Sequence, residues 1–220
     1  MGKMKYVQFS EKGPRTDNED CCNVVEIPGK QTLFVVCDGM GGHSYGEVAS
    51  KTVCDVFSAY WQEHQDSEDS IQIIQNATHA ARQALDDAAG KCHMGTTLVM
   101  ASIAGNEATI AHAGDSRCYV IDIKGNVKHF TLDHVNGGMI TNAFFSGCSW
   151  ELVLEAKRIT LEPLDRILLC TDGLYNAIGD TALLHILQCS KDVEQVADKY
   201  RAICKEQASD NYTGIIIEIE

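Results

Sequence analysis

Two Asp-Gly pairs, each following a run of apolar residues, are the first feature of this sequence that could carry chemistry. Asp38-Gly39 ends the segment LFVVCDG, and Asp172-Gly173 ends the segment RILLCTDG. Asp210 precedes a third apolar run, GIII. Strand ends let polar side chains leave a core and converge, and a glycine beside an aspartate lets another backbone approach closely. One Asp-Gly pair is most simply a turn, but two at the ends of apolar segments indicate a shared site.

Converging carboxylates of this kind suit the binding of divalent cations. Glu19 and Asp20, in the segment RTDNED, precede another predicted strand and add two acidic side chains. Carboxylates that lie close together repel one another unless a cation lies among them. Sites built from oxygen ligands favour Mg²⁺ or Mn²⁺ over zinc. The sequence therefore indicates a site for such cations, with isolated Asp-Gly turns as the alternative.

Short alternating segments and blocks of helical periodicity must position these residues. Strands are expected over residues 4–10, 22–27, 32–37, 96–104, 108–113, 118–123, 127–131, 152–161, 167–171 and 214–219. Helices are expected over residues 47–63, 71–89, 181–188 and 193–207, and residues 136–150 form a loop or small flap. Strands in succession, rather than in strict alternation with helices, favour an α+β fold with antiparallel sheets covered by helices.

Length and charge limit the class of protein. The 220 residues suit a single domain over residues 1–220 with one buried core. Eighteen Lys and Arg against 31 Asp and Glu give a net charge of −13, which disfavours nucleic acid as a partner. No apolar stretch approaches the roughly 20 residues of a membrane span, and the start of the chain lacks the apolar core of a secretory signal. We therefore expect no membrane partner.

The ten cysteines indicate neither a disulfide framework nor a zinc site. Half of them lie in apolar periodic segments, where a thiol behaves as a small apolar side chain: Cys37, Cys54, Cys118, Cys170 and Cys204. The sequence contains no Cys-x-x-Cys pair, which argues against structural zinc. We expect reduced thiols and a cytoplasmic protein.

The chain resembles metal-dependent protein phosphatases of the PPM family, also called type 2C, because seven short motifs occur in that family's order. They are RTDNED, VVCDGMGGH, GTT, AHAGDSR, TLDH, LLCTDGL and DNYTGIII. The resemblance covers the chain from about Tyr6 to Ile219. One such motif is weak evidence, whereas seven in order are specific. The resemblance implies a four-layer α-β-β-α sandwich, in which two antiparallel sheets are flanked by helices.

The resemblance also assigns the main metal ligands. It implies that Asp38 bridges two divalent cations and that the backbone carbonyl of Gly39 binds one of them. By the same resemblance, Asp172 and Asp210 complete the protein ligands of the second cation. Waters fill the remaining positions.

Four further positions match the family pattern around these ligands. Glu19 and Asp20 match positions that hold metal-bound waters. Arg15 matches the arginine that pairs with the substrate phosphate, a role for which its planar guanidinium is suited. Asp115, in GDSR, matches the position of a third, weaker ion in bacterial relatives. For Asp115 alone, a turn-capping aspartate is about as good an interpretation.

The activity implied by the resemblance is hydrolysis of phosphoserine and phosphothreonine in proteins. Two cations, Mn²⁺ or Mg²⁺, activate a shared water that attacks phosphorus directly, without a phospho-enzyme. The implied partners are phosphorylated proteins and a paired serine/threonine kinase, and we expect a monomer. Four other residues of the motifs are interpreted as structural supports: Thr96, Thr97, Asp133 and His134.

The sequence departs from the family pattern at two places. Eukaryotic members carry a histidine directly after Asp-Gly as the proposed general acid, whereas this chain has Met40 there and a histidine later, at His43. His43 is a candidate for the acid because histidine side chains titrate near neutral pH, and solvent or a metal-bound water is the alternative. Residues 136–150 form a reduced version of the family's mobile flap. We expect this shortening to loosen the discrimination between substrates.

Three alternatives remain beside an active phosphatase. A pseudophosphatase would bind phosphoproteins without hydrolysing them, and it should lack a metal ligand, yet Asp38, Asp172 and Asp210 are all present. A different two-metal hydrolase such as a nuclease is disfavoured by the acidic charge and by the lack of a basic strip. An interaction domain with incidental Asp-Gly turns would not require the ordered motifs.

Overall fold

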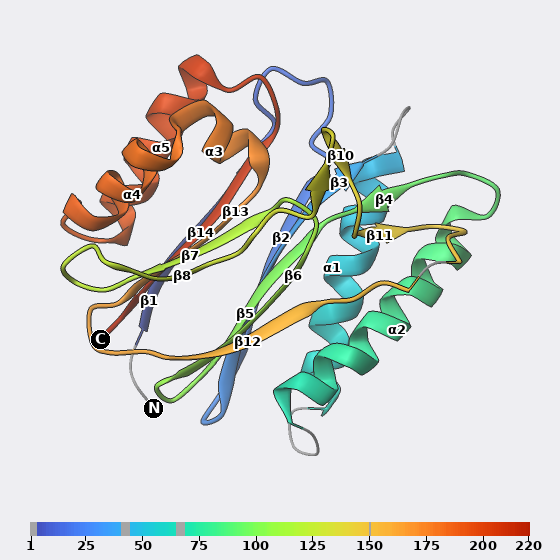
Figure 1. Cartoon of the computed structure of the whole chain (residues 1–220), viewed down its shortest axis with the longest axis horizontal. Helices are drawn as coiled ribbons and strands as arrows, with labels where there is room; N and C mark the ends of the chain where they lie inside the picture. Colours follow the sequence, from blue (N-terminus) through green and yellow to red (C-terminus); the bar gives the residue numbers. More distant parts are fainter. Residues whose placement is uncertain (1–3, 41–44, 65–68, 150) are drawn as a thin grey trace.

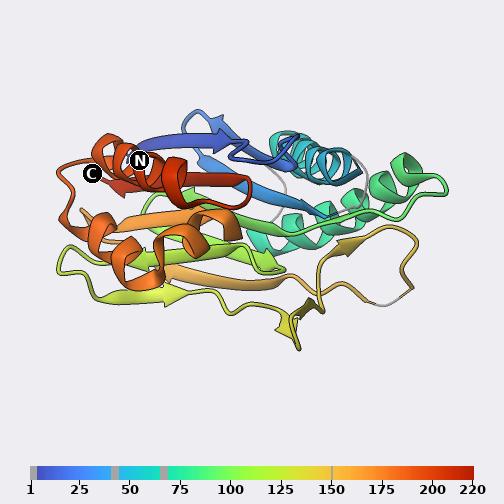
Figure 2. The same ribbon diagram turned by 90° about the horizontal axis from the view of Figure 1, so that it is seen from above.

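Two antiparallel sheets face each other, and helices cover the outer face of each sheet (Figure 1). The computed structural model describes residues 4–40, 45–64, 69–149 and 151–220. Figure 2 shows the same layers from above. This arrangement is the α-β-β-α sandwich that the sequence predicts.

The smaller sheet has the strand order β1-β14-β13-β7-β8. Its neighbouring strands pair antiparallel throughout. The bounds are β1 Met4–Glu11, β7 Arg117–Ile121, β8 Val127–Phe130, β13 Arg166–Cys170 and β14 Tyr212–Ile219.

The larger sheet has the order β11-β4-β3-β5-β6-β12, and β2 also pairs with β3. Its bounds are β2 Asp20–Ile27, β3 Gln31–Met40, β4 Gly95–Thr96, β5 Leu98–Ala104, β6 Glu107–Ala113, β11 Phe144–Phe145 and β12 Glu155–Thr160. A separate short hairpin is formed by β9 (Val135–Asn136) and β10 (Met139–Ile140).

The helices divide between the two outer faces. Helices α1 (Tyr45–His64) and α2 (Ser70–Ala89) cover the larger sheet, and α3 (Asp172–Ile178), α4 (Asp180–Cys189) and α5 (Val193–Gln207) cover the smaller one (Figure 1). Each group contributes apolar side chains to its own core, with Phe57 and Leu85 in the first and Leu183 and Tyr200 in the second. No helix in the described part of the chain has the length and apolarity needed to cross a bilayer.

The alternation of side chains along β3 decides which core each residue joins. Leu33, Val35 and Cys37 pack under the helices, whereas Phe34 and Val36 pack between the sheets. Successive strand residues point to opposite faces, so a strand covered on both faces is apolar throughout. The sheet-to-sheet layer is therefore continuous along β3 until the apolar run ends.

The structure differs from the predicted elements in several regions. Helix α3 was not predicted from the sequence. Its seven residues follow a strand directly and are too few to show a helical period. The strand expected over residues 152–161 is shorter, at Glu155–Thr160. Within residues 136–150, the described part contains the short strands β10 and β11 as well as loop.

Candidate active site

The alternation on β3 carries Asp38 into the layer between the two sheets. Asp38 follows Phe34 and Val36 on the same face of the strand, because residues two apart share a face. Asp20 lies directly opposite Asp38 in the β2–β3 register. Directly opposed residues of an antiparallel pair project to the same face of the sheet. Both carboxyl groups therefore lie at the edge of the layer between the two sheets, next to its apolar residues.

Residues from distant parts of the chain meet around one cavity of about 310 Å³. The end of β3, the start of α3 and the segment before β14 lie at the same end of the sheets, the upper end in Figure 1. The cavity is lined by Arg15, Glu19, Asp38, Gly39, Met40, Thr97, Asp115, Ile140, Asp172, Asp210 and Asn211. Five carboxylates against one guanidinium leave an excess of negative charge, which fits a site for divalent cations.

Hydrogen bonds from the neighbouring strands fix the backbone of Asp38. Its N–H donates to Thr97 Oγ1 at 3.0 Å, and its carbonyl accepts from Thr97 N at 2.9 Å and from Thr96 Oγ1 at 2.8 Å. The hydroxyls of Thr97 and Ser116 lie 2.7 Å apart. Thr96 and Thr97 thus act as supports of Asp38 rather than as ligands, as interpreted from the sequence.

Burial and mutual repulsion raise the pKa values of the clustered carboxyl groups. Burial raises the pKa of Asp38 well above its usual value, and the charges of Asp20 and Asp172 raise it further. Burial raises the pKa of Asp20 to about 7, although a hydrogen bond from Thr171 Oγ1 at 2.9 Å opposes the shift. Burial also raises the pKa of Asp172, and the charge of Asp210 adds to this effect. A cation among these groups would favour their ionised forms.

Arg15 and Asn211 connect the two edges of the cavity. Arg15 Nη2 donates to Asp210 Oδ2 at 2.6 Å, and Arg15 Nε donates to the carbonyl of Ser209 at 3.3 Å. Asn211 accepts from Glu19 N–H at 2.9 Å and donates to the carbonyls of Lys12 and Asp17. Asn211 therefore holds the loop that carries both Arg15 and Glu19.

Sequence reasoning did not single out Asn211 as a site residue. In the motif DNYTGIII, only Asp210 was predicted to be a site residue. The signal was the adjacent asparagine itself, since a buried amide in a polar segment commonly organises a loop through its hydrogen bonds.

The glycines after the two aspartates are required by close approaches. A Cβ on Gly39 would lie 2.1 Å from the carbonyl oxygen of Gly46, and a Cβ on Gly173 would lie 1.9 Å from that of Asn211. Both distances are far inside van der Waals contact, so any side chain would push a cavity wall away. The Asp-Gly pairs are therefore packing requirements of the site and not simple turns.

Asp115 reaches the same cavity from the loop between β6 and β7. Burial raises its pKa to about 6, and the charge of Asp172 adds to the shift. The carbonyl of Asp115 accepts a hydrogen bond from Tyr175 at 3.1 Å. Arg117 packs its guanidinium 3.6 Å from the Tyr175 ring centroid and forms a two-point ion pair with Asp133. Asp133 is thus placed as a support for this loop.

Among the described site residues, Asp20 is placed differently from the rest. Asp20 faces Asp38 and accepts from Thr171, but it lies behind the cavity wall and is 9% exposed. Asp20 therefore acts on the cavity through its charge and through Asp38. His43 lies outside the residues that the structure describes.

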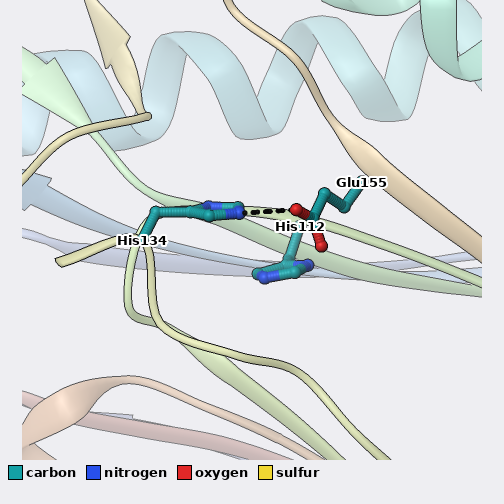
Figure 3. Close-up of side chains that lie close together, drawn as sticks. All are labelled: His112, His134 and Glu155. Atoms are coloured by element: carbon teal, nitrogen blue, oxygen red, sulfur yellow. Dashed lines mark ion pairs between the residues drawn. The ribbon is translucent and has the colours of Figure 1, made fainter.

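A second group of titratable side chains lies beside the site and comprises His112, His134 and Glu155 (Figure 3). The two imidazole rings stack nearly parallel, with centroids 4.5 Å apart and 10° between the planes. A metal ion lies in the plane of each imidazole that binds it, so stacked parallel rings cannot readily share one. His134 Nδ1 accepts from Gly114 N–H at 3.1 Å, which leaves the proton on Nε2, 3.4 Å from Glu155. This group is a hydrogen-bonded, ring-stacked cluster rather than a metal site.

His134 instead joins the short hairpin to the loop of Asp115. Its N–H donates to the carbonyl of Gly114, one residue before Asp115. Its own carbonyl accepts from the N–H and the hydroxyl of Thr141, at 2.8 and 3.1 Å. His134 thus acts as a structural support, which agrees with its interpretation from the sequence.

In comparisons with known proteins, the chain is similar to protein phosphatases both in sequence and in structure. A family model described as protein phosphatase 2C matches residues 13–208. The serine/threonine phosphatase stp of Listeria innocua is 27% identical, over 93% of this chain and 91% of that protein. Among solved structures, a bacterial serine phosphatase superposes with a TM-score of 0.85 at 27% identity, covering 99% of this chain and 98% of the other. The catalytic domain of the phosphatase PstP, solved with two manganese ions, superposes with a TM-score of 0.79 at 27% identity and 98% coverage of both chains.

Proposed function

Because the chain belongs to the protein phosphatase 2C family, we propose that the carboxylate cavity is its active site and holds two divalent cations. The chain is a serine/threonine protein phosphatase, as its relatives' names and its family indicate. The single observation that carries the site assignment is the meeting of Asp38, Asp172 and Asp210 in one cavity. If these three residues lay far apart, they would not bind the same cations.

The proposed roles of the side chains come from the family resemblance, and the places of these side chains around the cavity agree with them. Asp38 lies at the centre of the carboxylate cluster and would bridge the two cations, with the Gly39 carbonyl beside it. Asp172 and Asp210 would bind the second cation. Glu19 also lines the cavity and would hold water at its edge, whereas Asp20 would fix the charge and position of Asp38 from behind.

The cations, when bound, act as Lewis acids and lower the pKa of a coordinated water so that a nucleophile is available near neutral pH. The chain supplies the orientation of the substrate. Arg15 lies at the cavity edge with a planar guanidinium that can donate two parallel hydrogen bonds to phosphate oxygens. Its pairing with Asp210 keeps that guanidinium pointing at the cavity. Met40 and Ile140 supply the apolar part of the cavity lining.

Manganese is supported by the PstP catalytic domain, which was solved with two manganese ions. Oxygen ligands alone would accept Mg²⁺ as well. We also propose a third, weaker cation at Asp115, because this carboxylate lines the same cavity from a separate loop.

The wider setting is proposed from chemistry and from the chain itself. An enzyme that removes phosphate from serine and threonine requires a kinase that adds it, so a paired serine/threonine kinase is expected. We also propose that the chain is a monomer, which sedimentation velocity would test. All ten cysteines are free, which suits a reducing cytoplasm and is testable by cell fractionation. We treat residues 1–220 as one domain because the family match covers most of them.

A pseudophosphatase is not favoured, because no carboxylate of the proposed ligand set is missing from the cavity. Its distinguishing property would be binding of a phosphopeptide without release of phosphate. The same assay therefore separates the two functions.

Release of phosphate from a phosphothreonine peptide tests the proposed function. We expect turnover with Mn²⁺, loss of turnover with a chelator, and recovery when Mn²⁺ is added back. Asp172→Asn should lose activity, whereas Asp198→Asn, an exposed aspartate on α5, should not. Turnover that resists the chelator, or full activity in Asp172→Asn, would reject the metal-dependent mechanism.

A further inference from the structure

A second hollow of about 400 Å³ adjoins the active-site cavity. Most of its lining side chains are apolar, and they include Met40, Met94, Ile140, Phe145 and Cys148. Met40 and Ile140 also line the carboxylate cavity. The two hollows therefore share a wall, and a chain bound with its phosphate in the first passes beside the second.

Paired strands form the rigid side of this apolar groove. Met40 at the end of β3 lies opposite Gly95 of β4, and Gly95 lies opposite Phe145 of β11. A Cβ on Gly95 would lie 2.5 Å from Phe145 Cδ1, so the Phe145 ring lies directly over the glycine. The ends of β3, β4 and β11 lie together in Figure 1. This side of the groove is built by the large sheet itself.

The hairpin of β9 and β10 forms the opposite side through Ile140. The residue after Ile140, Thr141, donates two hydrogen bonds to the carbonyl of His134. Asn142 then donates to the carbonyl of Val153 at 2.7 Å. His134 is in turn held by Gly114 and by the cluster with His112 and Glu155 (Figure 3). The wall that carries Ile140 is thus tied down on both sides.

We propose that this groove binds an apolar side chain that flanks the phosphorylated residue of the protein substrate. The proposal rests on the proposed function. Neighbouring residues of an extended peptide are about 3.8 Å apart, so a side chain one or two positions away reaches a hollow that adjoins the phosphate site. Burial of that side chain against the groove is favourable. Selectivity of this kind is narrower than the shortened flap led us to expect.

The groove contributes to substrate binding and not to the chemical step, so we expect its effect on KM rather than on kcat. Interactions that are equal in the ground and transition states lower KM and leave kcat unchanged. An apolar side chain in such a pocket is worth about tenfold or more in kcat/KM. A substrate with a charged neighbour would gain nothing from the groove.

Phosphothreonine peptides that differ at one flanking position test the proposal. Each peptide carries leucine, glycine or aspartate at one of the two positions before or after the phosphothreonine, and kcat and KM are measured with Mn²⁺. At one position, we expect the leucine peptide to exceed the glycine peptide about tenfold in kcat/KM, through KM. Hydrolysis of p-nitrophenyl phosphate, which has no flanking residues, reports on the phosphate site alone.

Two groove variants and one matched control locate the selectivity. Phe145→Ala alters the groove wall without touching the carboxylate cavity, and Ile140→Ser alters the wall that both hollows share. In each variant, the ratio of kcat/KM for the leucine peptide to kcat/KM for the glycine peptide should fall to about twofold or less. Met139→Ser changes the neighbouring residue of the same hairpin, which is 72% exposed and lines neither hollow, and it should keep the full preference.

Each outcome bears on the proposal. Equal kcat/KM for the leucine and glycine peptides at every position in the wild type would overturn it. Retention of the preference in both Phe145→Ala and Ile140→Ser would also overturn it, because the selectivity would then arise elsewhere. If the wild type hydrolyses none of the peptides, the proposed function fails instead, which is a different result.

Discussion

In the middle of the layer between the sheets, β3 contributes Phe34 and Val36, and two residues further along the same face it contributes Asp38. Burial stabilises the first two by roughly 25 cal/mol per Å² of apolar surface. Burial of Asp38 raises its pKa, because removal from water disfavours the charged form. One structural pattern thus produces opposite free-energy effects within a single strand.

The same contrast is repeated on the facing sheet. Leu169 of β13 is fully buried between the sheets, and Thr171, two residues later, donates a hydrogen bond to Asp20. Apolar parts of the layer position the carboxylates, and those carboxylates are unfavourable until a cation compensates their charge. The site is therefore the part of the molecule where function and stability of the folded chain conflict.

Asp38→Asn should give the largest effect and should separate the two regions most clearly. Loss of the bridging carboxylate is expected to lower kcat/KM by on the order of 10³-fold, because several kcal/mol of transition-state stabilisation depend on the cations. Without cations, the variant should unfold at a higher temperature than the wild type near pH 7.5, because a repelled carboxylate becomes a neutral amide.

Phosphopeptide turnover and thermal unfolding in the presence of chelator measure these two effects. Asp198→Asn on the surface of α5 is the matched control and should change neither. An Asp38→Asn variant that keeps activity within tenfold of the wild type would contradict the assigned role.

Leu169→Ala tests the apolar part of the layer. Removal of a fully buried leucine side chain should lower the free energy of unfolding by about 2–5 kcal/mol. The kcat of the folded fraction should change little, because Leu169 does not line the cavity. Urea unfolding measures the free energy of unfolding, and phosphopeptide turnover divided by the folded fraction measures kcat. A large fall in kcat at unchanged stability would show that the two regions are not separable in this way.

Asn211→Ala tests how far the cavity depends on hydrogen bonds behind its lining. The variant loses the contacts of Asn211 to Glu19, Lys12 and Asp17, so we expect kcat/KM to fall about 10–100-fold, the usual effect of losing a group that orients ligands. Asn126→Ala, which removes the hydrogen bond from Asn126 Nδ2 to Asp122 in an exposed turn, is the control and should keep full activity. Wild-type kcat/KM in Asn211→Ala would mean that the loop holds its shape without it.

The stability of the folded chain without cations should depend on pH, because burial raises the pKa values of its clustered carboxyl groups. The pKa of Asp20 is raised to about 7 and that of Asp115 to about 6, so the folded chain binds more protons than the unfolded chain above about pH 4. Stability should therefore be highest in mild acid and should fall as the pH rises from about 4 through the raised pKa values of these groups. Mn²⁺ should remove the fall. A cation-free stability that rises over this range would contradict the assigned burial.

The sequence predicted most elements and the carboxylate cluster for physical reasons that are local. Apolar runs ending in Asp-Gly, turn residues and helical spacing all lie within a few residues of each other. The sequence did not show which face of β3 meets the other sheet, because residues 33–37 are apolar on both faces. The register that sets Asp20 opposite Asp38 is likewise a property of the folded sheet.

The parts that sequence reasoning missed depend on long-range contacts. Asn211 acts by hydrogen bonds to residues nearly 200 positions away, with separations of 192, 199 and 194 residues. Helix α3 is short and begins at Asp172, which the sequence indicated as the end of a strand. Ile140 reaches the cavity from a segment without a clear period. The roles of such residues can be recognised only in the folded structure, where these distant segments are in contact.

Calorimetric titration of the chain with Mn²⁺ tests the central claim most directly, because the claim is that carboxylates from distant segments share divalent cations. The wild type should bind two Mn²⁺ ions tightly, and Asp38→Asn should lose this binding while Asp198→Asn keeps it. Equal stoichiometry and affinity in the wild type and Asp38→Asn would show that the cations, if bound, are not held by this cavity.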